Sequence, residues 1–375
     1  MTPPQTVALP HPGAIRPAPD SPLAHSGCAR LVGAGTAVPA TSYSQQDVLD
    51  IFGIEDPRVR SVFLNSAIDR RYLTLPPEGP DGRRVAEEQG ALLAKHREQG
   101  IDMGVRAVLA CLKSAGAELS DIGYLCCVTS TGFLTPGFSA LLIRELGMDR
   151  HTSRVDVVGM GCNAGLNALN AVNGWARTHP GELAVMVCVE ACSAAYVFDG
   201  TMRTSVVNSL FGDGAAAVAV IADDPAARPG PAILKFTSCV IPEAVGAMRY
   251  DWDDDQGRFS FFLDPHVPYV VGAHAEIVVD RLLSGTGLRR ADLAHWLVHS
   301  GGKKVIDSVR VNLGLTQYDV RHTTEVLRDY GNVSSGSFLF SYERLSSEGV
   351  ALPGDYGLLM TMGPGSTIET ALVRW

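Results

Sequence analysis

The sequence predicts an α/β fold made of two similar halves around a largely buried sheet. Short β-rich runs that are apolar on both faces alternate with amphipathic helical patterns, which is typical of buried strands covered by helices. Apolar residues make up 46% of the chain, enough for a sizeable core. The third observation is an internal echo: DIGYLCCVTSTG, from Asp121, resembles DLAHWLVHSGG, from Asp292, so that Val128 aligns with His299. Each copy follows a helix and a turn, which indicates a repeated βα unit.

The individual elements follow from hydrophobic periodicity and from turn residues. Strands are predicted where short runs rich in Val, Ile, Leu and Cys are bounded by turn residues, and helices where apolar residues recur three and four positions apart. The predicted strands are 29–38, 124–131, 154–160, 183–191, 215–222, 233–240, 295–300, 356–362 and 368–375. The predicted helices include 44–52, 102–116, 165–179, 274–285 and 303–314.

Charge and hydropathy exclude two classes of partner. The net charge is −9 and no long run of Lys or Arg occurs, so we expect no nucleic acid as the main partner. No stretch reaches the ~18 continuous apolar residues of a membrane span, so we expect no membrane insertion. Residues 1–27 are rich in proline and lack the apolar core of a signal peptide. We therefore expect a flexible extension, with the folded part beginning near Cys28.

The eight cysteines do not form a recognisable disulfide or zinc pattern. No CxxC pair occurs, and most of the cysteines lie in apolar runs, where a cysteine is usually a small buried hydrophobe. The histidines show no ligand spacing with the cysteines. We expect reduced thiols, a cytoplasmic protein and no metal site.

The stretch VDVVGMGCNAGLNALNAV, residues 155–172, reads as strand, glycine-rich turn and helix. One interpretation is a dinucleotide site, because GMGCNA satisfies the loose pattern G-x-G-x-x-G/A and Glu190 lies where a ribose-binding acid belongs. A second partial match begins at Gly33, with Val38 in place of the last glycine. Such motifs match by chance often, and this one lies in the middle of the chain.

The other interpretation is that the turn serves to present the side chain of Cys162. The glycines permit a sharp bend and close approach of a substrate, and the helix that follows places its positive end beside the sulfur. A helix N-terminus lowers the pKa of a thiol and favours the thiolate. His299 follows an apolar strand and Asn332 follows a helix and a glycine, the places where α/β folds gather catalytic groups.

The stretches GMGCNAG, LFGDGAAA, HSGGKK, YGNVSSGS and MGPGS occur in this order. Together they resemble the thiolase-like condensing enzymes and, within them, the type III polyketide synthases of the chalcone synthase family. The resemblance covers the chain from about residue 30 to the end. It implies a Cys–His–Asn triad at Cys162, His299 and Asn332, with the thiolate also favoured by protonated His299.

The same resemblance implies the rest of the site and the fold. The fold would be a five-layer αβαβα arrangement of two duplicated halves, residues 28–225 and 226–375. A homodimer is implied, with Thr135 where a family residue crosses the interface. The remaining substrate-contacting positions implied are the gatekeepers Phe211 and Phe261, the active-site serine Ser334, and the loop Gly363, Pro364 and Gly365.

The stretches STGFLTPG, LNSAIDRRYLTLPPE, MRYDWD and RFSFFLDP resemble the bacterial subgroup of this family that makes 3,5-dihydroxyphenylacetyl-CoA. This resemblance implies malonyl-CoA as starter and extender, four units in all, and C8–C3 aldol closure, for dihydroxyphenylglycine and glycopeptide antibiotic supply. It implies CoA thioesters as substrates and no cofactor. Glu190 and Asp213 are buried acids for which structural hydrogen bonding is the expected role.

The chain departs from plant members of the family at several positions. Ser300 follows the histidine where many members have proline. Of three basic positions that bind CoA phosphates, only Arg58 remains basic, with Ser61 and Asn65 at the others. Lys303 and Lys304 either compensate for this loss or form a solvated helix start. Four rival functions stay open. Two are related enzymes: a type III polyketide synthase with another product and a single-round ketoacyl synthase III-type enzyme. The others are a nicotinamide-dependent oxidoreductase and a non-catalytic interaction protein, although the latter would leave the complete triad unexplained.

Overall fold

The computed structural model describes residues 27–375, apart from 81, 83, 197–200 and 225. The proline-rich extension predicted at 1–27 therefore lies outside the described residues, except for its last residue. Within the described ranges no helix is long and apolar enough to cross a membrane. The same residues contain no group of three or more His, Cys, Asp or Glu side chains that could hold a metal ion.

A nine-stranded sheet forms the framework, in the order β11-β12-β13-β8-β1-β7-β6-β4-β5. Every strand predicted from the sequence is present, with its ends displaced by a few residues at most. The strands of this sheet are β1 (Ala29–Ala37), β4 (Ile122–Thr129), β5 (Ser153–Val158), β6 (Leu183–Glu190), β7 (Gly214–Ala222), β8 (Ala232–Val240), β11 (Leu293–Val298), β12 (Tyr356–Gly363) and β13 (Thr367–Arg374).

The sheet consists of two halves with the same topology, which confirms the predicted duplication. Outward from the centre, one half runs β1, β7, β6, β4 and the other runs β8, β13, β12, β11. In each half the second strand is antiparallel to both of its neighbours, whereas the third and fourth strands are parallel. The halves join where β1 meets β8 at the pair Arg30 and Ala232.

The sequence echo is also visible in local structure. Strand β4 follows the short 3-10 helix η1 (Leu119–Asp121), and β11 follows η5 (Arg290–Asp292). In both, the final aspartate accepts a hydrogen bond from the backbone three residues earlier: Asp121 from Glu118 at 2.9 Å and Asp292 from Arg289 at 2.7 Å. An aspartate at this position closes the turn that leads into the strand.

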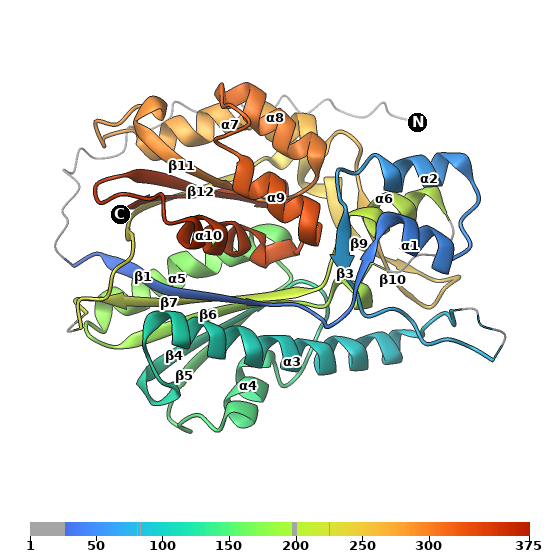
Figure 1. Ribbon diagram of the computed structural model, residues 1–375, viewed down its shortest axis with the longest axis horizontal. Helices are drawn as coiled ribbons and strands as arrows, with labels where there is room; N and C mark the ends of the chain where they lie inside the picture. Colours follow the sequence, from blue (N-terminus) through green and yellow to red (C-terminus); the bar gives the residue numbers. More distant parts are fainter. Residues whose placement is uncertain (1–26, 81, 83, 197–200, 225) are drawn as a thin grey trace, which may run out of the picture.

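Helices complete the five layers (Figure 1). Helices α7 (Val267–Leu283) and α8 (Lys303–Leu313) cover one half, α5 (Ala164–Thr178) and α10 (Ser337–Glu348) lie between the halves, and α3 (Gln89–Ala115) and α4 (Phe138–Leu146) cover the other half. A central apolar cluster combines residues of α5 and α10 with residues of both halves of the sheet. Two further clusters lie beneath the outer helices. The predicted αβαβα layering is therefore confirmed.

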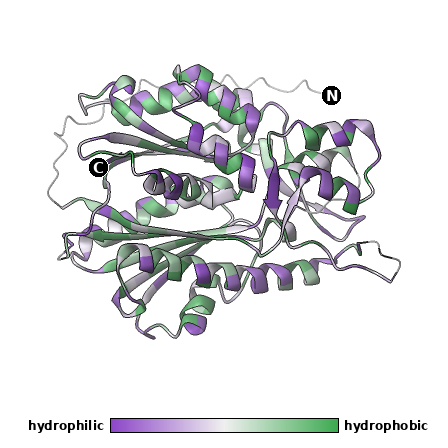
Figure 2. Ribbon diagram, viewed as in Figure 1, coloured by the Kyte–Doolittle hydropathy of each residue, from purple (hydrophilic) through white to green (hydrophobic). Residues whose placement is uncertain are grey.

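Amphipathic patterning explains why the outer helices bind the sheet on one side only. Figure 2 shows mainly hydrophobic strands in the half containing β1, β6 and β7, whereas α3 alternates hydrophobic and hydrophilic residues along its length. Helix α3 begins at Gln89, well before the predicted start at residue 102, and α7 begins at Val267 rather than at 274. In both cases the sequence prediction found only the strongly periodic part of the helix.

A group of small elements at one end of the layers was largely missed from the sequence (Figure 1). Strands of three residues and an isolated hairpin carry too little periodicity to be recognised. These elements are β2 (Ser42–Ser44), α1 (Gln45–Ile51), α2 (Pro57–Leu64), β3 (Arg70–Tyr72), α6 (Met202–Leu210), β9 (Met248–Asp253) and β10 (Arg258–Leu263). Of these, only α1 was predicted. Helix α9 (Arg321–Tyr330), which packs on α10, was also missed.

Candidate active site

Cys162 lies at a sharp turn between β5 and α5, in the 3-10 helix η2 (Gly161–Asn163). The turn needs glycine at position 161, because its φ is 76° and a Cβ there would lie 2.2 Å from Cδ of Pro364. Gly363 is equally constrained, since a Cβ there would lie 2.4 Å from Oδ1 of Asn163. The predicted GPG loop thus packs directly against the cysteine turn and holds its backbone.

The equivalent turn of the second half meets this one. Helix α10 is preceded by η6 (Ser334–Gly336), just as α5 is preceded by η2, and the two 3-10 turns are in contact. At the contact, Sγ of Cys162 lies 3.6 Å from Oγ of Ser334, although the two residues are 172 positions apart in the chain. Cys162 is buried, with 6% of its surface exposed. The duplication therefore places the 3-10 turn before α5 in one half against the equivalent turn before α10 in the other half.

Asn332 is held by three backbone interactions. Its N–H donates to the carbonyl of Leu210 at 2.8 Å, its carbonyl accepts from Gly212 at 3.1 Å, and its side-chain Oδ1 accepts from the Ser334 N–H at 2.9 Å. With Oδ1 engaged in this way, the amide nitrogen is left as the donor that faces the cysteine. A hydrogen bond from the Asn332 side chain to Cys162 lowers the pKa of the thiol.

His299 follows β11, and its orientation fixes its tautomer. Nδ1 is hydrogen-bonded to Oγ of Ser337, and that hydroxyl donates to the carbonyl of Ser334 at 3.0 Å. With the single hydroxyl proton directed at that carbonyl, the neutral ring carries its proton on Nδ1. Nε2 is then the basic nitrogen. Ser337 and Ser334 link His299 to Cys162, since Ser334 contacts both Ser337 and the sulfur.

Burial opposes a charge on the Cys162 thiol and on the His299 imidazole. It raises the pKa of the Cys162 thiol to about 12, and the hydrogen bonds from Ser334, the Cys162 amide and Asn332 offset this only in part. Burial also lowers the pKa of His299 to about 3. These directions run against a resting thiolate beside protonated His299, because a buried charge loses its hydration, and the predicted charge state stays a prediction. Burial thus disfavours the charged form of each group.

The predicted gatekeepers lie together. Phe211 and Phe261 are buried, with ring centroids 6.3 Å apart in an edge-to-face arrangement. They belong to the same apolar cluster as Cys162 and Cys192. Tyr196 stacks on Phe211 at 3.9 Å and meets Phe261 edge-on at 5.3 Å. A cavity of about 130 Å³ opens beside this layer, lined among others by Arg71, Cys192, Tyr196 and Phe211.

Arg71 positions Phe211, a role that the sequence prediction missed. Its side chain is 1% exposed and donates to the carbonyl of Phe211 at 2.7 Å, to the carbonyl of Asn208, and to Oε1 of Gln45 at 2.9 Å. Burial lowers the pKa of Arg71 to about 10, which leaves the guanidinium charged at neutral pH. Nothing in the local stretch DRRYL distinguishes this arginine from its exposed neighbour Arg70.

Glu190 and Asp213 both accept several hydrogen bonds. Glu190 accepts from the Ser130 N–H at 2.9 Å and from the Ser335 hydroxyl, and burial raises its pKa to about 6. Asp213 accepts from the Ser193 N–H at 2.7 Å and from the Thr74 N–H at 2.8 Å. Burial raises the pKa of Asp213 as well. Both carboxyls therefore tie loops together beside the site.

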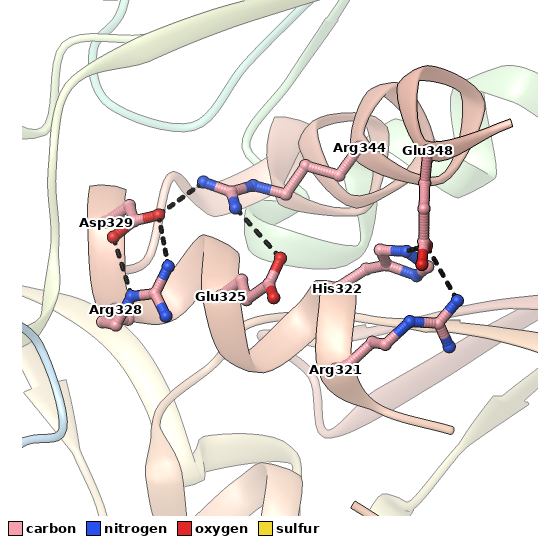
Figure 3. A network of polar contacts seen from close by, with 7 residues as sticks. All are labelled: Arg321, His322, Glu325, Arg328, Asp329, Arg344 and Glu348. Carbon is pink, nitrogen blue, oxygen red and sulfur yellow. Dashed lines mark hydrogen bonds and ion pairs between the residues drawn. The ribbon is translucent and has the colours of Figure 1, made fainter. Parts of the chain in front are cut away.

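An ion-pair network braces the segment that carries Asn332 (Figure 3). Arg344 of α10 binds Glu325 at 3.1 Å and Asp329 at 2.6 Å, both on α9. Glu348 of α10 binds Arg321 at 2.8 Å and His322 at 2.5 Å. Residues 331–336 connect these two helices. The network therefore clamps the elements on both sides of the active-site turn.

The remaining predicted residues lie on the surface. Arg58, near the start of α2, is exposed, as are Lys303 and Lys304 at the start of α8. Lys303 forms an ion pair with Asp307 at 2.6 Å. Asn65 donates to the carbonyl of Ser61 at 2.8 Å. Thr135 is exposed and lies close to Phe133, which is 72% exposed. The roles predicted for these residues in CoA binding and in the dimer stay predictions.

The chain matches a family of known proteins over most of its length. Residues 20–225 match the model for chalcone and stilbene synthases, N-terminal domain, and residues 237–375 match the C-terminal domain. The 3,5-dihydroxyphenylacetyl-CoA synthases of Amycolatopsis balhimycina and Streptomyces toyocaensis are each 74% identical, over 92% of this chain and 93% and 90% of theirs. A 1,3,6,8-tetrahydroxynaphthalene synthase of Streptomyces peucetius subsp. caesius is 30% identical over 91% of both chains.

Solved structures give the same result for the fold. The C-terminal type III polyketide synthase domain of Steely1, from Dictyostelium, is similar with a TM-score of 0.84 and 27% identity, over 92% of this chain and 99% of that one. The 1,3,6,8-tetrahydroxynaphthalene synthase of Streptomyces coelicolor is similar with a TM-score of 0.82 and 27% identity, over the same shares of the two chains.

Proposed function

The chain belongs to the chalcone and stilbene synthase family, and from this premise we propose that it makes 3,5-dihydroxyphenylacetyl-CoA from four units of malonyl-CoA. The observation that carries the chemistry is the meeting of the Cys162 turn with the Asn332–Ser334 segment. The identity of 74% to synthases of that name supports the product. We extend the proposal to a supply of dihydroxyphenylglycine for glycopeptide antibiotics.

Loading of the enzyme begins at Cys162. Nε2 of His299 accepts the thiol proton as the sulfur attacks the thioester carbonyl of malonyl-CoA. The thiolate exists only in passing, which agrees with the burial that disfavours a resting charge. CoA leaves, and the acyl group remains on the sulfur. The apolar surroundings keep water from the acyl-enzyme.

Chain extension needs donors rather than a cofactor. A second malonyl-CoA loses CO2, and its thioester oxygen becomes an enolate oxygen. The amide nitrogen of Asn332, together with His299 in its protonated form, donates to that oxygen. One such preorganised donor is worth ~3 kcal/mol of barrier. The enolate carbon then attacks the acyl-Cys162 thioester, and the chain grows by two carbons. Ser334 lies beside the sulfur, where it orients the acyl group.

The product follows from carbon counting. Four malonyl units lose four CO2, one from the starter and one in each of three extensions, and so give an eight-carbon tetraketide. A bond from C8 to C3 closes a six-membered ring with a two-carbon acyl arm. Loss of water and enolisation give the 3,5-dihydroxyphenylacetyl group. Phe211 and Phe261 separate the CoA side from the chain side and exclude water.

The proposal extends to binding and assembly. CoA phosphates would meet Arg58, Lys303 and Lys304, while Gly363, Pro364 and Gly365 keep the cysteine turn in place. We propose a cytoplasmic homodimer formed through the exposed region of Phe133 and Thr135 next to the edge strand β5. Size-exclusion chromatography with light scattering tests the dimer, and a monomeric protein at micromolar concentration would contradict it.

Mass spectrometry of the products formed from malonyl-CoA alone tests the function. We expect 3,5-dihydroxyphenylacetyl-CoA, or its free acid after hydrolysis. A different aromatic product or a pyrone would indicate another type III polyketide synthase activity. A single β-keto product that forms only on a carrier protein would favour the ketoacyl synthase III-type alternative.

A further inference from the structure

Ser337, the first residue of α10, is a buried serine to which the mechanism above gives no role. It has no exposed surface, and neither has Ser334, three positions earlier in the chain. Ser334 contacts the sulfur of Cys162, whereas the hydroxyl of Ser337 is hydrogen-bonded to Nδ1 of His299. One short segment therefore touches both the candidate nucleophile and the candidate base.

The two contacts of the Ser337 hydroxyl can both be hydrogen bonds in only one tautomer of neutral His299. The hydroxyl oxygen lies 3.0 Å from the carbonyl oxygen of Ser334, and a carbonyl has no proton to give. The hydroxyl proton serves this contact, so the contact with Nδ1 needs a proton from the ring. The other tautomer, with its proton on Nε2, would leave two oxygen atoms facing each other without a proton. The two contacts together select Nδ1–H and leave Nε2 as the basic nitrogen.

The carbonyl that accepts this hydroxyl proton belongs to a residue with an unusual backbone. Ser334 has a φ of 48°, in the left-handed region that a residue other than glycine rarely adopts. Its N–H donates to Oδ1 of Asn332 at 2.9 Å, and its carbonyl accepts from both the N–H and the hydroxyl of Ser337. The strained residue is thus held on both sides, which keeps its carbonyl in reach of the hydroxyl. The conformation of Ser334 and the tautomer of His299 are coupled through one side chain.

The other edge of the His299 ring is left open. Nε2 has no hydrogen-bond partner within the described part of the chain, where the hydroxyl of Ser337 is the one side-chain partner of this ring. The backbone of Gly301 passes beside the open edge, since a Cβ there would lie 3.2 Å from Nε2. Burial is the cause of the lowered pKa of His299, and no described carboxylate raises it. A neutral hydroxyl therefore orients the ring without placing a second charge beside it.

We propose that Ser337 is a positioning residue that holds His299 in the Nδ1–H tautomer and so keeps Nε2 free to accept the thiol proton of Cys162. This inference rests on the proposed function. In the loading step the S–H bond breaks, the proton goes to Nε2, and an electron pair of the sulfur forms the bond to the thioester carbon. The ring is then an imidazolium whose Nδ1–H still donates to Ser337, so no group has to turn. The proton leaves with the sulfur of CoA, which restores the neutral ring.

The test compares Ser337→Ala with the matched control Ser341→Ala. Ser341 lies one turn further along α10, is equally buried, and donates to the carbonyl of Ser337 at 3.4 Å, so the control removes a buried hydroxyl that does not bind His299. NMR of protein whose histidines carry the heavy nitrogen isotope shows which ring nitrogen is protonated, and a His299→Gln variant identifies the signal. The release of CoA from malonyl-CoA gives kcat and KM, and thermal unfolding shows whether each variant folds.

We expect the Nδ1–H tautomer of His299 and similar kcat values in the wild type and in Ser341→Ala. In Ser337→Ala the Nε2–H tautomer should appear, and kcat should fall about tenfold or more with little change in KM, because a base whose acceptor nitrogen is already protonated cannot take the thiol proton. The Nε2–H tautomer in the wild type would overturn the proposal. So would a folded Ser337→Ala variant in which either the tautomer or kcat is unchanged.

Two further outcomes also decide. If Ser337→Ala does not fold, Ser337→Cys takes its place, since a thiol is similar in size to the hydroxyl but a weak hydrogen-bond partner. A lower kcat in that variant would support the proposal, and a wild-type kcat would overturn it. If the wild type makes a different product from malonyl-CoA, the proposed function is wrong. The tautomer, which is measured without turnover, and the rate of CoA release then still decide the role of Ser337.

Discussion

At the scale of single residues, Cys162 is the proposed nucleophile, and we expect that no neighbouring thiol can replace it. Cys162→Ala should abolish product formation while thermal unfolding stays close to the wild type, because one buried sulfur is removed without a change of backbone. Loss of acyl-enzyme by intact-protein mass spectrometry is the measurement. Cys239→Ala, which alters a half-buried thiol in β8, is the matched control and should keep full activity. Persistent product in Cys162→Ala would disprove the assignment of the nucleophile.

Arg71 shows how a buried charge can position a residue of the candidate site. Arg71→Met removes the donors of two buried acceptors and one partly buried acceptor, so we expect a loss of about 3 kcal/mol or more in the free energy of unfolding. Urea denaturation measures this loss. Arg70→Met alters the exposed neighbour and should change stability by less than about 0.5 kcal/mol. Equal effects of the two variants would show that the contacts of Arg71 with Phe211 and Asn208 contribute little.

At the scale of elements, the cysteine turn depends on its packing against the GPG loop. Gly161→Ala and Gly159→Ala introduce the same positive-φ strain, since the φ angles are 76° and 83°. Only position 161 also has Pro364 within 2.2 Å of the new Cβ, whereas position 159 has no atom within 4 Å. We expect kcat to fall about 100-fold in Gly161→Ala through displacement of the sulfur, and far less in Gly159→Ala. Similar kcat values would contradict this.

The clamp between α9 and α10 gives a prediction for pH dependence. Hydrogen bonds from Arg328 and Arg344 lower the pKa of Asp329 from 3.8 to about 2. The folded state therefore gains stability above pH 3.8 and loses it as the pH falls towards about 2. Arg344→Ala should cost about 1 kcal/mol at neutral pH, because the pairs are partly exposed.

Thermal unfolding at a series of pH values tests the clamp. The difference between Arg344→Ala and the wild type should be constant near neutral pH and should shrink as the pH falls from 3.8 towards about 2, where Asp329 of the folded protein takes up a proton. Arg106→Ala, which breaks an exposed pair with Asp102, is the control and should cost less than about 0.5 kcal/mol. A difference that does not depend on pH would show that Asp329 is not the partner that matters.

At the scale of the whole molecule, the two halves are expected to unfold together. The central cluster takes α5 from one half and α10 from the other, so neither half can bury its inner face alone. Calorimetry should show one transition for the full chain. Two separated transitions, or a folded fragment containing residues 27–225 alone, would indicate independent domains.

Much of the architecture could be predicted from the sequence, because the features concerned are local. The strands of the large sheet were found as apolar runs, and the duplication was found from the echo between Asp121 and Asp292, which recurs as the same aspartate-closed turn. The short strands β2 and β3 and the hairpin of β9 and β10 were missed, because their stability comes from contacts with distant segments. The strength of the hydrophobic periodicity, rather than importance for function, decided which helices and strands could be predicted from the sequence.

The sequence by itself determined the candidate reactive groups and their order along the chain: a cysteine at a glycine turn, a histidine after a strand, and an asparagine after a helix. Only the tertiary structure decided their surroundings. It brought Cys162 to Ser334 across 172 positions, placed Arg71 behind Phe211, and packed Tyr196 and Tyr250 against the gatekeepers. It also shifted the pKa values of the ionisable side chains at the site, because burial is a property of the whole fold. A residue type states what chemistry is possible, whereas packing decides its partners, its solvent and its protonation.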